Sequence, residues 1–445
     1  MDIVGLIPSF GGLVWTVAAF VVALSIIVAV HEYGHYIVGR WTGIHAEVFS
    51  LGFGPVLFAR TDRRGTRWQI AALPLGGYVK FLGDADASSN AVDSRVMAQL
   101  SADERRHTMA GAPLWARSAT VAAGPLFNFA LSILVFTAFF LARGIATDIP
   151  VVGATKPLPV ASALEAGDRI LAVDGRPVED MAAFTAAIEA IAPAPVVQYT
   201  VERDGRALTL DGPFPFPAIA DAVQPQSAAA DVGMRPGDVV LAIDGVPVNA
   251  FSELRAAVGA SDGRPLLLTV WRGGETLEVA LVPRRMDLPL AQGGFETRWL
   301  IGLTGGLAFV PEARTPGPFE AIALGAEQTW VIARTSLSAL WHMVTGAISS
   351  CNLRGPIGIA ETSGAAAAQG IESFVWFVAM LSTAIGLLNL FPIPILDGGH
   401  LVFHAWEAAT GRPPGHRAVR ALMTGGLALL LTLMVFALTN DLFCP

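Results

Sequence analysis

Long uncharged apolar stretches dominate the pattern of hydrophobic and polar positions along this chain. The four longest are Leu13–Val30, Ser118–Ala142, Ser373–Leu396 and Ala421–Asn440. A membrane-spanning helix needs about 20 mostly apolar residues, because each residue rises about 1.5 Å through about 30 Å of hydrocarbon. We therefore predict a multi-pass α-helical membrane protein with four transmembrane helices.

A fifth stretch, Thr335–Leu353, also lacks acidic and basic residues but is more polar than the other four. It contains His342, Gly346 and several Ser and Thr, and Arg334 and Arg354 flank it. A fifth crossing would also place the loop after the third span on the opposite side of the membrane from the polar end of the first span. We predict an outward-side amphipathic helix here rather than a span.

Basic residues indicate the direction of the spans, because short cytoplasmic loops are enriched in Lys and Arg. The loop between the first and second spans contains Arg40, Arg60, Arg63, Arg64, Arg67, Lys80, Arg95, Arg105, Arg106 and Arg117. The loop between the third and fourth spans contains Arg412, Arg417 and Arg420, whereas the N-terminus and the stretch after Asn440 contain no Lys or Arg. Both loops are predicted to face the cytoplasm, and both termini and the long middle segment to face outward.

The outward segment contains an internal repeat. Gly167–Val178 (GDRILAVDGRPV) and Gly237–Val248 (GDVVLAIDGVPV) are identical at eight of twelve positions at an offset of 70, and stretches starting at Thr200 and Thr269 match at an offset of 69. Each copy has a β-branched run ending in Asp-Gly, then a helix-compatible stretch and a further hairpin. Duplication of a β-rich domain of about 70 residues is the simplest interpretation.

The core shared by the two copies, G-D-x-[IV]-L-x-[VI]-[DN]-G, resembles circularly permuted PDZ domains of bacteria. PDZ domains bind an extended peptide by adding it to a sheet edge. Peptide-binding domains and β-rich spacers without a ligand remain open alternatives, since no residue identifies a peptide.

Composition agrees with a membrane protein. The chain is 53% hydrophobic and 15% charged, with a mean hydropathy of +0.55, whereas soluble domains are roughly a quarter charged. The net charge of −8 provides no basic face for phosphates, which excludes nucleic acid as a partner. The two cysteines, Cys351 and Cys444, are too few for a disulfide framework or a Cys-rich zinc site. A single bridge between them and two unrelated small apolar residues are both compatible with the sequence.

Polar residues with metal-binding spacing lie at the cytoplasmic end of the first span. His31-Glu32-Tyr33-Gly34-His35 is an H-E-x-x-H motif, and residues four apart lie on one face of a helix. Two imidazoles so placed can ligate one Zn²⁺, with Glu32 beside them as a base toward water. An ionised group within a span costs roughly 2.5–3.5 kcal/mol on insertion scales, and a bound cation compensates for it. The alternative is that these residues merely emerge into the headgroup region.

Zinc also needs a third protein ligand and an open position for water. The best acid is Asp397, in the run NLFPIPILDGGH from Asn389, where Pro392 and Pro394 break the helix of the third span. Broken helices at membrane depth line a cavity or are buried in protein, and such a break would bring Asp397 to the cytoplasmic end of the first span. His400 is the competing ligand.

These motifs together resemble the site-2 protease family. HEYGH in the first span and N-x-x-P-x-P-x-L-D-G in a later one carry the resemblance. Four spans with two PDZ-like units between the second and third resemble the bacterial regulator-of-sigma-E type within this family. The likeness covers essentially the full chain, and includes GFGP at Gly52–Pro55, GGYVK at Gly76–Lys80, AGPLFN at Ala123–Asn128 and GPIGIA at Gly355–Ala360.

The resemblance implies a zinc endopeptidase that cuts single-span membrane proteins within or beside the bilayer. It implies that His31, His35 and Asp397 hold zinc, and that Glu32 acts first as general base and then as acid. The implied partners are the lipid bilayer, substrates of the anti-sigma factor type or remnant signal peptides, and peptide ligands of the PDZ-like domains. The implied location is the bacterial inner membrane. The alternative function is a membrane scaffold with peptide-binding PDZ domains and a non-catalytic metal site.

Further residues have roles that follow only from the resemblance. The implied substrate-binding residues are Asn389, Pro392 and Pro394 after the third span, and Gly76, Gly77 and Tyr78 in a hairpin that dips into the membrane. Gly124, Pro125 and Asn128 of the second span would pack near the active site, where helix–helix packing by small residues explains them better than direct catalysis.

The predicted organisation follows the spans and the repeat. It consists of 1–40, the first span with H-E-x-x-H; 41–117, a cytoplasmic loop with the membrane-associated β-hairpin; 118–144, the second span; 145–222 and 223–288, the two PDZ-like domains; 289–372, an outward-facing linker with amphipathic helices; 373–400, the third span with its proline-containing motif; 401–420, a cytoplasmic loop; and 421–445, the fourth span and tail.

Overall fold

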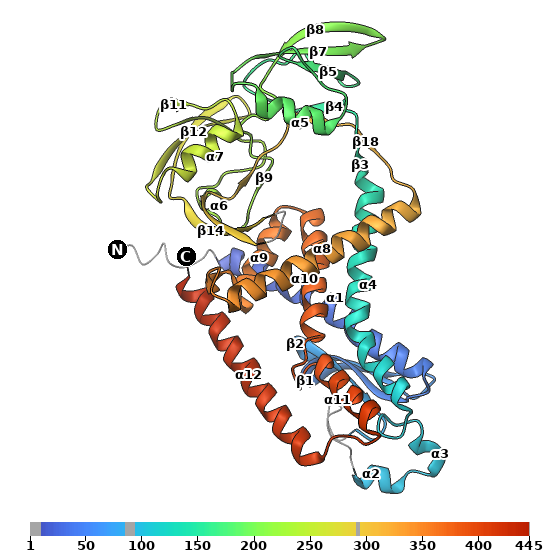
Figure 1. The fold of residues 1–445 in the computed structure, drawn as a ribbon. Coiled ribbons are helices and arrows are strands. Elements are labelled where there is room, and N and C mark those ends of the chain that lie inside the picture. The colour runs from blue at the N-terminus through green and yellow to red at the C-terminus, as the bar shows by residue number, and fades with distance from the viewer. Residues whose placement is uncertain (1–9, 85–93, 291–293, 445) are drawn as a thin grey trace. The chain divides into compact units, whose positions relative to one another are not determined.

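The structure of the chain is a computed structural model that describes residues 10–84, 94–290 and 294–444 (Figure 1). The chain forms two compact units. The helical unit contains the described residues of Met1–Ala138, Ile322–Leu340 and Leu353–Cys444. The strand-rich unit contains those of Phe139–Ala321 and Trp341–Asn352.

Four helices of the described chain are long and apolar enough to cross a membrane. They are α1 (Phe10–Trp41), α4 (Leu114–Arg143), α10 (Ile371–Asn389) and α12 (His416–Phe443). This confirms the prediction of four candidate spans from length and composition. The third helix ends at Asn389 rather than at Leu396, because Pro392 and Pro394 have no backbone N–H to donate and restrict the residues before them.

The stretch considered as a fifth span is not among these candidate membrane helices. Its first half is the end of α8 (Pro318–Val344), and its second half contains a 3₁₀ turn at Ser350–Asn352. The remaining helices outside the strand-rich part are α2 (Ser94–Gln99), α3 (Ala102–Arg105), α9 (Pro356–Ala368) and α11 (Asp397–Thr410).

Small residues allow the helices of the helical unit to approach closely. A methyl group on Gly34 of α1 would lie 2.6 Å from the carbonyl oxygen of Ala123 in α4. A methyl group on Gly386 of α10 would lie 3.1 Å from the carbonyl oxygen of Pro125. Backbone contacts of this kind are typical of membrane helices, whose association depends on van der Waals packing rather than on burial from water. The helix α4 therefore contacts both α1 and α10.

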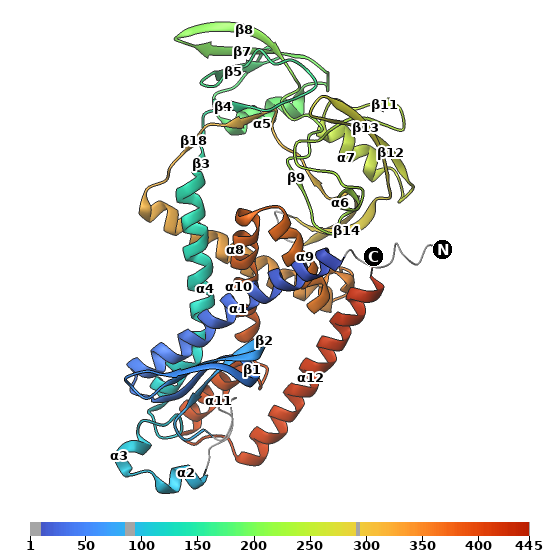
Figure 2. The ribbon, with the colours of Figure 1, turned by 180° about the vertical axis from the view of Figure 1, so that it is seen from behind.

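Two long strands, β1 (Ala46–Thr61) and β2 (Arg67–Phe81), form the sheet that follows α1 (Figure 2). Both strands are bent, so residues 46–51 of β1 pair with residues 77–81 and also with residues 67–70 of β2. Gly77 lies against α1, where a side-chain methyl would be 2.9 Å from Val28 and 3.0 Å from Glu32. Only glycine permits this approach of the strand to the helix.

The strand-rich unit contains two four-stranded sheets with the same strand order. One has the order β6-β5-β7-β8 and the other β11-β10-β12-β13. The first set is β5 (Arg169–Val173), β6 (Arg176–Pro177), α5 (Met181–Ala190), β7 (Val197–Arg203) and β8 (Arg206–Gly212). The second is α6 (Ala228–Asp231), β10 (Val239–Ile243), β11 (Val246–Pro247), α7 (Phe251–Gly259), β12 (Leu266–Arg272) and β13 (Glu275–Leu281).

Each sheet contains an equivalent ion pair between a buried aspartate and a partly exposed arginine. Arg203 donates two hydrogen bonds of 2.7 Å to Asp168, and Arg272 donates bonds of 2.7 and 2.6 Å to Asp238. Burial by itself raises the pKa of the Asp168 carboxyl, but the bonds from Arg203 and from the N–H of Glu165 outweigh burial and lower that pKa. The two pairs lie at the offsets of the sequence repeat, so the copies share side-chain geometry as well as sequence.

Short strands that follow the second sheet in the sequence pair with earlier strands of both copies. These are β16 (Leu303–Thr304), which pairs with β9 (Ala222–Val223), and β17 (Phe309–Pro311), which pairs with β4 (Val152–Thr155). The hairpin β14 (Arg284–Pro289) and β15 (Phe295–Leu300) precedes them, and β18 (Ala313–Arg314) pairs with β3 (Ile145–Ala146) after them.

The hydrophobic cores of the two copies include residues from this later segment of the chain. The second core begins at Ala218 and includes Ile301, and the first core includes Phe309. Both cores therefore extend beyond the ranges 145–222 and 223–288. The first core also contains Ala250, which lies between the limits of the second core, so the two cores alternate along the chain.

Candidate metal centre

The two histidines of the H-E-x-x-H motif are oriented by α4. His31 and His35 lie one turn apart on α1, with their Nε2 atoms 3.2 Å from each other. His35 donates from Nδ1 to the carbonyl oxygen of Thr120 at 2.8 Å, which leaves the lone pair of its Nε2 available to a metal. The ring of His35 is thus held in the orientation that a metal ligand needs.

Asn128 of α4 holds His31. Its amide lies 3.3 Å from His31 Nδ1, while its Oδ1 is buried without a hydrogen-bond partner in the described chain. A metal on Nε2 requires the proton of His31 to be on Nδ1. Rotation of the amide by 180° makes Oδ1 the acceptor of that proton and supplies the missing partner. Asn128 is therefore an outer partner of the centre as well as a packing residue.

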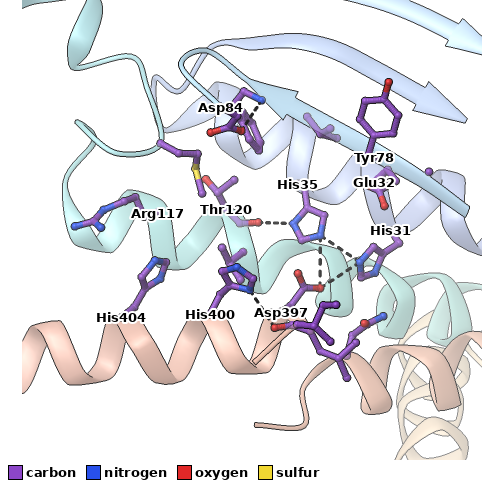
Figure 3. A pocket seen from close by; sticks show the side chains of 18 of the residues that line it. His31, Glu32, His35, Tyr78, Asp84, Arg117, Thr120, Asp397, His400 and His404 are labelled. Atoms are coloured by element: carbon purple, nitrogen blue, oxygen red, sulfur yellow. Dashed lines mark hydrogen bonds and ion pairs between the residues drawn. The ribbon is translucent and has the colours of Figure 1, made fainter. Parts of the chain in front are cut away.

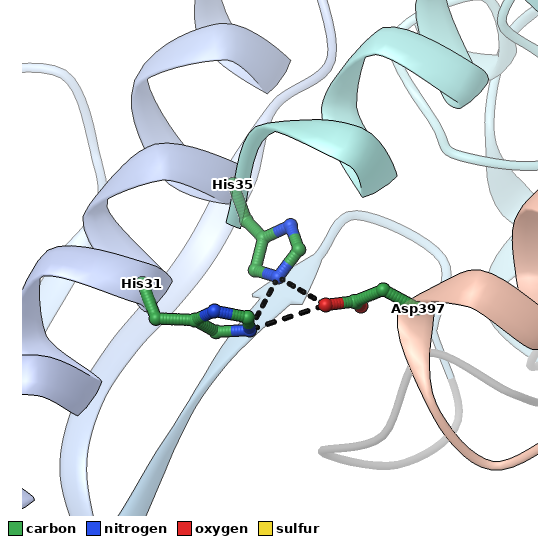
Figure 4. Close-up of side chains that lie close together, drawn as sticks. All are labelled: His31, His35 and Asp397. Carbon is green, nitrogen blue, oxygen red and sulfur yellow. Dashed lines mark hydrogen bonds and ion pairs between the residues drawn. The ribbon is translucent and has the colours of Figure 1, made fainter. Parts of the chain in front are cut away.

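Asp397 completes a cluster with these two histidines (Figure 4). Its Oδ2 lies 3.2 Å from His31 Nε2 and 3.6 Å from His35 Nε2. Tetrahedral zinc with bonds of about 2.0–2.1 Å separates its ligand atoms by about 3.3 Å, which matches these spacings. The Oδ2 atom is buried and lacks a hydrogen-bond partner in the described chain, as expected of a ligand atom whose partner is a cation. The three side chains fit zinc.

The loop between α10 and α11 places Asp397 next to the histidines of α1. Asp397 is the first residue of α11, and the two glycines after it pack against the loop that precedes it. A methyl group on Gly398 would lie 2.3 Å from the carbonyl oxygens of Leu390 and Phe391, and one on Gly399 would lie 2.3 Å from that of Ile393. The glycines allow the loop to fold back tightly, and Asp397 is placed at the turn.

The cluster lies in one wall of a cavity of about 510 Å³ (Figure 3). The lining residues come from α1 (His31, Glu32, His35), β2 (Gly77, Tyr78, Val79, Phe81), the connection to α4 (Asp84, Met109, Ala110), α4 itself (Arg117, Thr120, Val121) and the end of α10 onward (Asn389, Ile395, Leu396, Asp397, His400, His404). Glu32 also accepts a hydrogen bond from the backbone N–H of Val79, which joins the motif to the strand at the cavity wall.

The structure brings most of the predicted site residues together. Asp397, rather than His400, lies with the paired histidines, and His400 lines the same cavity with its Nδ1 3.1 Å from the carbonyl oxygen of Leu396. Asn389 and Gly77 line the cavity. Tyr78 lines it too, while its hydroxyl accepts a hydrogen bond from Gln69.

Three other predicted residues are not among the lining residues of the described chain. Gly76 packs on Phe53, and Pro394 lies against Gly426 of α12. Pro392 lies in the loop before Asp397.

Some groups around the centre were not predicted to belong to it. The carbonyl of Thr120, the N–H of Val79 and the side chain of His404 belong to this group. Backbone groups carry no sequence signal. For His404 a signal existed, because it follows Asp397 by seven residues and two helical turns place both on one face.

Comparison with known proteins identifies the family. The model of peptidase family M50 matches residues 19–433. The chain belongs to this family, that of the site-2 proteases. It is 37% identical to a protein named as a zinc metalloprotease in Agrobacterium fabrum, over 97% of each chain. It is 38% identical to one so named in Rhizobium meliloti, over 96% of each chain.

A third relative has a more specific name. The regulator of sigma E protease of Salmonella typhimurium is 33% identical, over 96% of this chain and 98% of its own. These matches cover nearly the whole chain and include the H-E-x-x-H motif. The chain is a metalloprotease whose cofactor is zinc.

Proposed function

We propose that this chain is an intramembrane zinc endopeptidase that cleaves single-span membrane proteins. The observation that carries the proposal is the meeting of His31, His35 and Asp397 beside Glu32, in a cavity between candidate membrane helices. A polar centre of this kind is costly in an apolar helix unless it binds a cation and has a function. Membership of a zinc-protease family supports the same proposal.

Each residue of the centre has a proposed role. His31, His35 and Asp397 would hold zinc, and a bound zinc ion would supply Lewis-acid chemistry toward the scissile carbonyl and toward a water molecule. The Glu32 carboxylate accepts the proton of that water and passes it to the leaving nitrogen of the peptide bond. Asn389, at the end of α10 in the cavity wall, donates its amide N–H to the oxygen that becomes negative.

The segment 77–81 of β2 is the proposed docking strand for the substrate. It pairs with β1 along one edge, and residues Gly77 and Tyr78 line the cavity. An unwound substrate strand added here would recover the hydrogen bonds that its helix loses. Because Val79 contacts Glu32, a strand at this position lies next to the proposed base. Gly76, Pro392 and Pro394 are proposed to act by fixing the backbone next to the residues that line the cavity.

We expect cleavage to depend on how readily the substrate helix unwinds. Replacing a helix-breaking residue near the scissile bond by Leu should slow cleavage several-fold, because Gly and Pro lower helix stability by about 1 and 3 kcal/mol relative to Ala. The measurement is the initial rate on a single-span substrate and its Leu variant in the same vesicles. A matched Leu substitution near the end of the substrate span is the control. Equal rates for all three would exclude unwinding as a requirement.

The strand-rich unit is proposed to consist of two PDZ-like domains that arose by duplication. The common strand order and the two equivalent Arg–Asp pairs support this proposal. Such domains bind extended peptides at a sheet edge. On the outward side they would act as a size filter, which admits only substrates whose outer domain has been removed.

The proposed location is the bacterial inner membrane, with the centre near the cytoplasmic side and both termini and the PDZ-like domains in the periplasm. The distribution of Lys and Arg supports this orientation. Neither of the two cysteines, both within the described residues, is a free thiol, and disulfides persist in oxidising compartments. The name of the Salmonella relative suggests a substrate of the anti-sigma factor type.

Zinc content tests the ligand set directly. We expect Asp397→Asn to weaken zinc binding by more than about 100-fold, since even outer partners of zinc ligands contribute 10–100-fold. Asp84→Asn is the matched control, because Asp84 lines the same cavity outside the cluster. Metal analysis of the purified full chain under a chelator gives the result. Retention of zinc by Asp397→Asn would reject the ligand set.

A further inference from the structure

An ion pair joins α4 to α11 beside the proposed zinc site, and its arginine, Arg117, lines the same cavity as the zinc ligands. Arg117 of α4 binds both carboxylate oxygens of Glu407 in α11, at 3.1 and 2.6 Å. The two residues are separated by 290 positions in the sequence, and their side chains are only 18% and 19% exposed. Arg117 also donates from Nε to the carbonyl oxygen of Ala112 at 3.1 Å. A two-bond pair of this kind fixes the orientation of both side chains.

A neighbouring hydrogen bond supports the same contact. Ser118 donates from Oγ to the carbonyl oxygen of Leu114 at 2.9 Å, and Oγ lies 3.2 Å from Nδ1 of His404. Because the hydroxyl proton of Ser118 is donated to Leu114, the Ser118 oxygen accepts a hydrogen bond from Nδ1–H of His404. Burial, with Arg117 nearby, lowers the pKa of His404 to about 4. The ring is therefore neutral at physiological pH and adds no positive charge beside Arg117.

The proposed metal ligand Asp397 lies in the same helix as Glu407. The loop between α10 and α11 contains Pro392 and Pro394 and is not helical, so α10 does not extend as a rigid rod to Asp397. Asp397 and Glu407 are ten residues apart in α11, which corresponds to about 15 Å along the axis. At 100° per residue, Asp397, His404 and Glu407 lie within one face of the helix. Figure 3 shows His400, His404 and Asp397 along the side of α11 that faces Arg117 and Thr120.

The same helix α4 holds the other two ligands. Thr120 accepts from His35, Asn128 contacts His31, and Gly124 lies so close that a methyl group there would be 2.3 Å from His35 Nε2. Arg117 lies three residues before Thr120 and seven before Gly124, so all of these residues are on one face of α4. One helix face thus contacts both histidines and also the helix that carries Asp397.

We propose that Arg117 and Glu407 are positioning residues: their ion pair sets where α11 lies on α4, and thereby where the Asp397 carboxylate lies relative to the two imidazoles. The inference rests on the proposed ligand set. Neither Arg117 nor Glu407 is a proposed metal ligand, so the pair acts on the metal through the position of α11. Loss of the pair lowers zinc affinity because the carboxylate is then no longer held at its ligand position.

The test compares zinc binding by full-length variants in detergent or nanodiscs. Glu407→Gln keeps the size of the side chain and removes its charge. We expect its zinc dissociation constant, measured against a chromophoric chelator, to rise about 10- to 100-fold, the range typical of outer partners of metal ligands. The visible absorption spectrum of the Co²⁺-loaded form should shift toward that of Asp397→Asn.

Glu320→Gln is the control, because Glu320 also makes a two-bond pair, with Arg314 at 2.9 and 2.6 Å, at a more exposed position outside the centre. It should bind zinc as the wild type does. A wild-type constant and spectrum for Glu407→Gln overturn the inference, as does an equal loss in Glu320→Gln. If Glu407→Gln does not fold, Arg117→Lys, which keeps the charge but loses the two-bond geometry, is measured instead, and a wild-type constant there also overturns it.

Asp397→Asn separates this inference from the proposed function. If Asp397→Asn binds zinc as tightly as the wild type, the ligand set itself is wrong. If Asp397→Asn loses zinc and Glu407→Gln does not, only the positioning role is wrong.

Discussion

Glu32→Gln should abolish peptide cleavage while leaving zinc in place. The glutamine side chain has the same size and lines the same cavity, but it cannot accept the proton of the attacking water. General-base catalysis typically contributes 10²–10⁴-fold, so we expect a rate loss of at least about 10²-fold. The measurement is cleavage of a co-expressed single-span substrate, followed by gel shift of the shortened product, together with the zinc content of the purified variant.

The control for this substitution is Glu327→Gln, which makes the same change on an exposed position of α8. It should cleave and bind zinc as the wild type does. A scaffold with a structural metal needs no base, so its function would persist in Glu32→Gln. Persistent cleavage in Glu32→Gln would therefore remove Glu32 from the mechanism, and loss of zinc would show that Glu32 has a structural role instead.

Gly124→Ala should disable the centre as severely as the loss of a ligand. The added methyl group would lie 2.3 Å from His35 Nε2 and 2.8 Å from His31 Cε1, where no real contact is tolerated. One imidazole must move, or α4 must retreat from α1 and take Thr120 and Asn128 with it. We expect zinc affinity to fall by more than about 100-fold, beyond the 10–100-fold effect of an outer partner. Chelator competition measures this loss.

Gly425→Ala provides the control for Gly124→Ala. Gly425 also lies in a candidate membrane helix, α12, but a methyl group there meets nothing within 4 Å. Both changes raise intrinsic helix propensity by about 1 kcal/mol, so propensity alone cannot distinguish them. Wild-type zinc affinity in Gly124→Ala would show that α4 is free to move away from the histidines.

Features with a strong periodic signal were predictable from the sequence. The four candidate spans, the H-E-x-x-H pair and the acid after the third span all follow from apolar length, from helical spacing and from the cost of ionised groups in lipid. The two prolines correctly indicated a break in the third helix, but the predicted apolar span ended at Leu396 and the helix ends at Asn389. Apolar residues continue through the loop, so hydropathy alone does not show where the helix stops.

Features that depend on long-range pairing were not predictable. Arg117 and Glu407 are separated by 290 positions, and nothing local indicates that either has a partner. Thr120 and Val79 contribute backbone groups, which any residue could supply. Gly124 was visible as a small residue in the second span, yet only the structure shows that two imidazoles lie directly against it.

The returning strands β16 and β17 have a consequence for how this protein can vary. Because β17 supplies Phe309 to the core of the first copy, a truncation anywhere between the two copies would leave that core incomplete. The core of the second copy consists of residues between Ala218 and Ile301. Ala250, within this range, belongs to the core of the first copy, so excision of the second copy would also leave the first core incomplete.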